Sequence, residues 1–117
     1  MDDRSLRSLN LVFRFILEIV VLVALLLWGF SASDEPVVQL ILGLGAPAIA
    51  IAVWGTFVAP KATRRLDDPA RLGLEIVVFG AGVLAFIASG RLEVGILLAV
   101  AAALSLVLMV LWGQRGY

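Results

Sequence analysis

The feature that most constrains this chain is a series of four apolar stretches, each about as long as a membrane is thick. A bilayer core of about 30 Å requires roughly 20 apolar residues in a helix. Stretches of that length cover residues 9–30, 37–58, 70–89 and 92–112. Because lipid offers no partner for exposed backbone groups, spans of this kind are expected to be helices. The sequence therefore predicts an all-α polytopic membrane protein, a four-helix bundle forming a single membrane domain over residues 1–117.

The composition excludes several classes of protein. Of the 117 residues, 62% are hydrophobic and 15% are charged, and the nine basic residues balance the nine acidic ones. A chain with zero net charge has no basic surface for nucleic acid. It also contains no His and no Cys, so neither imidazole nor thiolate is present as a catalytic group or metal ligand. We expect no enzyme, and no catalytic, cofactor or metal site. The expected partners are the lipid bilayer and other membrane helices.

The basic residues outside the spans or at their edges predict the orientation. Placed on the four spans, they gather on one side of the membrane, with Arg91 alone on the other. The side that carries them has Arg4, Arg7, Lys61, Arg64, Arg65, Arg71 and Arg115. Because cytoplasmic loops are rich in Lys and Arg, we expect a multi-pass protein of the cell membrane with both termini in the cytoplasm.

Part of the first span recurs in the third. Residues 14–21 read RFILEIVV and residues 71–78 read RLGLEIVV, identical at six of eight positions. Each copy is followed by a short turn and a second apolar stretch. The chain is therefore interpreted as two duplicated hairpins, with halves at about 9–58 and 66–112. Since the first and third spans run in the same direction, the repeat would be a parallel one.

The repeated segment carries four of the five charges that lie inside the spans, the fifth being Glu93. Arg14 and Glu18, like Arg71 and Glu75, are four residues apart and share one helical face. A charge in a hydrophobic segment costs about 2.5–3.5 kcal/mol, so such residues face a bundle interior and form pairs.

An Arg that precedes a Glu is the less favourable order for an intrahelical pair. We therefore predict an exchange between the two helices, in which Arg14 reaches Glu75 and Arg71 reaches Glu18. The cluster is interpreted either as a structural lock or as a proton or cation site, because desolvated carboxylates can take up protons near neutrality.

A second motif closes the second span. Residues 54–62 read WGTFVAPKA, in which Trp54, Thr56, Pro60 and Lys61 carry the distinctive chemistry. Pro60 is expected to end the helix and to free its last carbonyl groups. Lys61 would favour both the helix C-terminus and anionic lipid headgroups. These residues are interpreted as a helix stop with a lipid contact, or as a cytoplasmic gate beside the charged cluster.

Shorter signals concern helix ends and helix contacts. Asp68 and Pro69 are expected to be the N-cap and the first residue of the third helix. Small residues within the spans are expected where helices pack closely. These are Gly43, Pro47, Ala50, Gly73, Gly80, Gly82, Ala99 and Ala103.

The segment 54–62, the Arg65-Leu66 pair followed by Pro69, and Glu75 together resemble the YrdB-like small membrane proteins. That family is defined by a domain of unknown function, and the resemblance covers essentially the whole chain. It implies a protein of about this length with four membrane helices. It implies no particular reaction, ligand or partner.

Two functions are compatible with these features. The first is a structural or accessory subunit, or a homo-oligomer, held by the Arg and Glu cluster. The alternative is a small proton-coupled transporter or channel that uses Glu18 and Glu75. Co-purifying subunits would favour the first function, and a water-filled cavity that reaches Glu18 would favour the second. The sequence by itself names no substrate, partner or oligomeric state.

Overall fold

The computed structural model describes residues 3–59, 62 and 64–113. Over these residues the chain is all-helical, as the apolar stretches predicted. Four of its helices are long and apolar enough to cross a membrane, and the second of them, Pro36–Val58, consists of an α-helix that continues into a short π-helix. In chain order the elements are α1 (Asp3–Ser31), α2 (Pro36–Val53), the π-helix η1 (Trp54–Val58), α3 (Ala70–Ala88) and α4 (Leu92–Leu111).

The structure also defines where the first and third helices begin. Helix α1 begins at Asp3 rather than near residue 9. Hydropathy marks where a helix becomes apolar, and polar residues extend the same helix beyond that point. The predicted start of α3 near residue 70 is confirmed, but the predicted N-cap is wrong by one residue. Pro69 occupies the N-cap position and Ala70 is the first helical residue, while the Asp68 carboxylate contacts Arg71.

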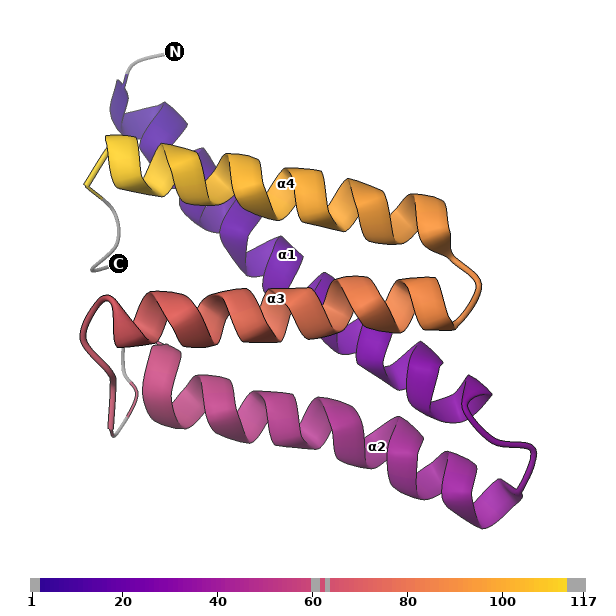
Figure 1. Ribbon diagram of the computed structural model, residues 1–117. Coiled ribbons are helices and arrows are strands. Elements are labelled where there is room, and N and C mark those ends of the chain that lie inside the picture. Colours follow the sequence, from indigo (N-terminus) through magenta and orange to yellow (C-terminus); the bar gives the residue numbers. More distant parts are fainter. Residues whose placement is uncertain (1–2, 60–61, 63, 114–117) are drawn as a thin grey trace.

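Helix α1 lies across the other three helices. Figure 1 shows α1 running diagonally behind α2, α3 and α4, and α3 packs against α4. Accordingly α1 contacts all three. Its buried face presents Leu17, Val21 and Ala24, spaced three or four residues apart, to a core that includes Phe79 and Phe86 of α3. The arrangement makes α1 the element around which the polar residues of the interior gather.

Glycines allow the closest helix contacts. A Cβ atom on Gly29 of α1 would overlap the backbone of Leu42 and Gly43 in α2, so only glycine permits this crossing. A Cβ atom on Gly82 would lie 3.0 Å from Val21 Cγ2. The predicted contact roles of Gly43 and Gly82 are confirmed by their burial.

For four of the small residues, the predicted close contact is wrong or incomplete. Gly73 is exposed and Gly80 half-buried, and a Cβ atom on either would meet open space. Ala99 and Ala103 are exposed on α4. The pattern of small residues identified the right type of residue, but only the helix crossings determine which of them make contacts.

The turn between α1 and α2 is closed by its own polar residues. The Glu35 carboxylate accepts hydrogen bonds from the backbone N–H groups of Val37 and Val38, both at 3.3 Å. It therefore caps the first turn of α2. Gln39 Nε2 donates to the carbonyl oxygen of Ser33 at 2.7 Å. This capped turn joins α1 to α2.

The outer surface of the bundle is apolar. Large hydrophobic side chains are exposed on all four of the long helices. Phe15 of α1, Leu44 of α2, Val77 of α3 and Leu97 of α4 are examples. Because the buried side chains include Arg14, Arg71 and Glu75, this surface reverses the usual pattern of a protein in water.

Candidate functional site

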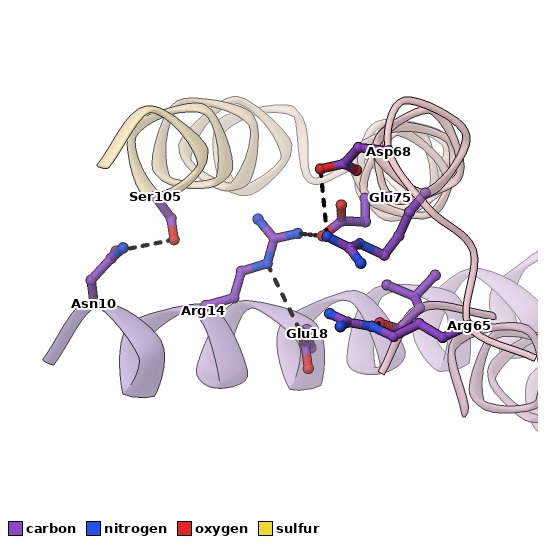
Figure 2. Close-up of polar contacts among 9 residues, drawn as sticks. Asn10, Arg14, Glu18, Arg65, Asp68, Glu75 and Ser105 are labelled. Atoms are coloured by element: carbon purple, nitrogen blue, oxygen red, sulfur yellow. Dashed lines mark hydrogen bonds and ion pairs between the residues drawn. The ribbon is translucent and has the colours of Figure 1, made fainter. Parts of the chain in front are cut away.

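The candidate site is centred on Arg14, on the buried face of α1. Its side chain is almost fully enclosed, with 2% of the residue exposed. Nη2 donates a hydrogen bond to Glu75 Oε1 of α3, and Glu75 is 1% exposed (Figure 2). The predicted contact between Arg14 and Glu75 is therefore present. Glu18, one turn further along α1, places Oε1 3.8 Å from Arg14 Nε.

Two aromatic rings complete the surroundings of the Arg14 guanidinium. Its central carbon lies 4.6 Å from the centroid of the Phe79 ring and 5.9 Å from that of the Trp54 ring. These two rings pack edge to face, with centroids 5.8 Å apart and planes at 82°. Cation–π contacts stabilise a cation that has left water. Trp54, predicted as part of a gate, thus joins the predicted polar cluster, and Phe79 adds a contact that the sequence had not indicated.

Arg71, which occupies the position of Arg14 in the similar segment 71–78, has different contacts. It is also buried, but Nη2 lies 3.4 Å from Asp68 Oδ2 and Nη1 lies 3.4 Å from the carbonyl oxygen of Leu66. These contacts join the start of α3 to the loop before it. The pairing of Arg71 with Glu18 stays a prediction.

A third polar contact lies one turn before Arg14. Ser105 Oγ of α4 donates to Asn10 Oδ1 at 3.2 Å, and both residues are buried. Asn10, Arg14 and Glu18 are four residues apart and so follow one face of α1. Along that face, Asn10 contacts α4 and Arg14 contacts α3. The polar face of α1 therefore joins three helices.

The loop after η1 folds back and caps it. Ala59 N–H donates to the carbonyl oxygen of Trp54 at 2.8 Å, the five-residue spacing of a π-helix. The carbonyl oxygens of Thr56 and Phe57 accept hydrogen bonds from the backbone N–H groups of Arg64 and Leu66, at 2.9 and 2.8 Å.

The last carbonyl oxygen of η1, that of the buried Val58, accepts a hydrogen bond from Arg65 Nε at 3.1 Å. The last three carbonyl groups of η1, which a helix C-terminus leaves without intrahelical partners, thus have partners within the chain. A cation at this end also complements the helix dipole. The structure places Arg65 there, although the sequence had indicated Lys61. Pro60 and Lys61 lie outside the described residues.

Two cavities lie beside Phe79. The first, of about 220 Å³, lies between α1 and the α2–η1 segment and is lined by Glu18 and Trp54. The second, of about 260 Å³, lies between α3 and α4 and is lined by Arg14 and Glu75. Phe79 lines both cavities, and the other lining residues are apolar. Over the described residues, no group of three or more His, Cys, Asp or Glu side chains is placed to hold a metal ion.

These features define a small helical protein with four membrane-capable helices and a buried ion-pair cluster. Residues 12–103 match the family described as Protein of unknown function (DUF2568), and the chain belongs to that family. The matched region contains Arg14, Glu18, Trp54, Arg71 and Glu75. No curated protein and no solved structure has significant similarity to the chain.

Proposed function

We propose that this chain is a small multi-pass membrane protein with a structural or accessory role, acting as a homo-oligomer or as a subunit of a larger complex. The single observation that carries the proposal is the hydrogen bond between Arg14 and Glu75 inside an apolar bundle. Charges in that position hold helices together, because separating them would leave each charge in hydrocarbon. The exposed apolar surface is suited to lipid and to other membrane helices.

The assembly can be tested on protein extracted from membranes with a mild detergent. Native mass spectrometry of the wild type should detect a mass above 12.5 kDa, as a multiple of the chain or with an added subunit. The Glu75→Gln variant should yield less of this assembly. Monomers alone, obtained both after gentle extraction and after cross-linking in the membrane, would contradict the proposal.

The alternative, a proton-coupled transporter or channel, is supported by a different observation. The cavity of about 220 Å³ reaches Glu18, whose side chain is 18% exposed. A Glu18→Gln variant in liposomes tests this alternative by pH-dye measurement of proton flux. Flux that is present in the wild type and lost in a folded Glu18→Gln variant would favour transport. Equal flux in the two proteins would remove Glu18 from any proton path.

Orientation, origin and activity complete the proposal. Both termini are assigned to the cytoplasm of a cell-membrane protein, on the distribution of Lys and Arg. The two hairpins are assigned to a duplication, supported by the shared positions of Arg14 and Arg71 and of Glu18 and Glu75. We also propose that the chain is related to the YrdB-like small membrane proteins. We propose no enzymatic activity and no nucleic-acid partner.

A further inference from the structure

The Arg14 guanidinium has more hydrogen-bond donors than the bundle supplies with acceptors. An Arg side chain carries five N–H donors. Among the described residues, Arg14 makes one hydrogen bond, to Glu75. Its Nε is buried without a hydrogen-bond acceptor in that part of the chain, since Glu18 Oε1 is 3.8 Å away. Nε itself faces Glu18, but the terminal nitrogen Nη1 also has no acceptor among the described residues and lies on the side away from Glu18 (Figure 2). Because a donor that has left water without an acceptor is costly, an acceptor reaching Nη1 from outside the bundle would be favoured.

The position of Arg14 shows where such an acceptor could enter. Figure 2 shows the guanidinium between α3 and α4, with one terminal nitrogen at Glu75 and the other on the side away from Glu18. Arg14 lines the cavity between these helices, about 260 Å³ in volume. The walls are small or aliphatic, including Gly80, Ala99 and Ala103. An apolar cavity with a few convergent polar groups is the usual form of a small-molecule site.

The charges select the kind of acceptor. Glu75 and Glu18 already lie beside Arg14, so an anionic headgroup would be repelled by two carboxylates. A neutral carbonyl oxygen can accept from the guanidinium without that repulsion. Glu75 lies five residues into α3, which is about 8 Å along the helix axis, so the site is deeper than the end of the span. A molecule dissolved in the hydrocarbon reaches this depth more easily than the ester group of a phospholipid.

We propose that the cavity between α3 and α4 binds a neutral, lipid-soluble carbonyl compound of the quinone class. A ring carbonyl accepts a hydrogen bond from Arg14, and the ring lies against Phe79 and the small residues of α3 and α4. The alkyl tail extends along the apolar outer surface. This site goes beyond the structural role proposed above. It depends on membrane insertion and is independent of the oligomeric assembly.

The test uses the whole chain in lipid nanodiscs, with decylubiquinone as the probe and quenching of tryptophan fluorescence as the readout. Two glycines of α3 form a matched pair, because a Cβ atom on either meets open space. Gly80 lines the cavity, whereas Gly73 does not. Gly80→Leu should weaken binding about tenfold or more by filling the cavity, while Gly73→Leu should change it less than about twofold.

Three outcomes would overturn the proposal. The first is equal binding of the probe by Gly80→Leu and Gly73→Leu. The second is that quenching of the wild type does not saturate beyond the quenching seen with empty nanodiscs. The third is that oleate and added phospholipid displace the probe to the same extent. Co-elution with the nanodisc measures membrane insertion separately. Failed insertion would contradict the proposed function, whereas absent binding by an inserted protein would contradict this site alone. Isotope-edited infrared spectroscopy gives a second readout, because the carbonyl band of bound probe should shift on binding and the shift should be lost in Arg14→Lys.

Discussion

Arg14 is the residue on which the buried contacts converge. It contacts Glu75 of α3, Trp54 of η1 and Phe79 of α3, and it lies near Glu18 in its own helix. Arg71, at the matching position of the similar segment 71–78, contacts Asp68 and the loop before α3. A repeated pair of residue types therefore serves two purposes. Arg14 joins α1 to α3, whereas Arg71 holds the start of α3 against the loop before it.

The residue-scale prediction concerns the partner of Arg14. Glu75→Gln should lower the free energy of unfolding by about 3 kcal/mol, because breaking a buried pair leaves a charge without compensation. Glu93→Gln, at an exposed site in the first turn of α4, should change it by less than about 0.5 kcal/mol. Denaturation in detergent, followed by circular dichroism, measures both. Equal stability of the two variants would show that the Arg14–Glu75 contact contributes little.

At the scale of the elements, the crossing of α1 and α2 is set by one glycine. Gly29→Ala should destabilise the protein by about 2 kcal/mol, because the new methyl group would overlap the backbone of α2. The control is Gly45→Ala, where a Cβ atom meets open space and where alanine favours the helix. Thermal melts of the purified variants give the comparison. If both variants melt like the wild type, α1 and α2 do not cross at Gly29.

The end of η1 supplies a second prediction for an element. Arg65→Ala removes the side-chain donor to the Val58 carbonyl oxygen, and should cost about 1–2 kcal/mol. Arg64→Ala keeps the backbone bond to Thr56 and replaces an exposed side chain, so it should have little effect.

Hydrogen exchange resolves the effect of Arg65→Ala by position. Amide protons in residues 54–58 should exchange faster in Arg65→Ala than in Arg64→Ala. Faster exchange throughout the chain in Arg65→Ala would instead indicate a global loss of stability. Identical exchange in the two variants would remove Arg65 from the cap.

For the whole molecule, the arrangement of the helices makes the proposed orientation testable. Helix α1 begins, and α4 ends, at the same end of the bundle as the loop between α2 and α3 (Figure 1). The chain has no Cys, so a single introduced thiol reports its own position. Ser8 near the start of α1 and Ala32 in the turn before α2 are both exposed.

An impermeant maleimide should label Ala32→Cys in intact cells and Ser8→Cys only after permeabilisation. This is expected because Lys and Arg gather on the side of Ser8. Labelling after denaturation controls for the reactivity of each thiol. The reverse pattern would place both termini of the chain outside the cytoplasm.

The sequence by itself determined the number of helices, their approximate ends and the buried Arg14–Glu75 contact between the first and third helices. These follow from local properties, namely the length of each apolar stretch and the cost of a charge within it. The Arg14–Glu75 contact was predictable, because four charges on two parallel helices have few ways to pair.

Only the tertiary structure decided that α1 crosses the other three helices, and that Arg65 caps η1. It also decided that Phe79 lies beside Arg14, that Ser105 meets Asn10, and that Arg71 has other contacts than Arg14. These features depend on the angle at which helices cross and on a loop that returns to its own helix. Such contacts join residues distant in the chain, so no local pattern of hydropathy or charge specifies them.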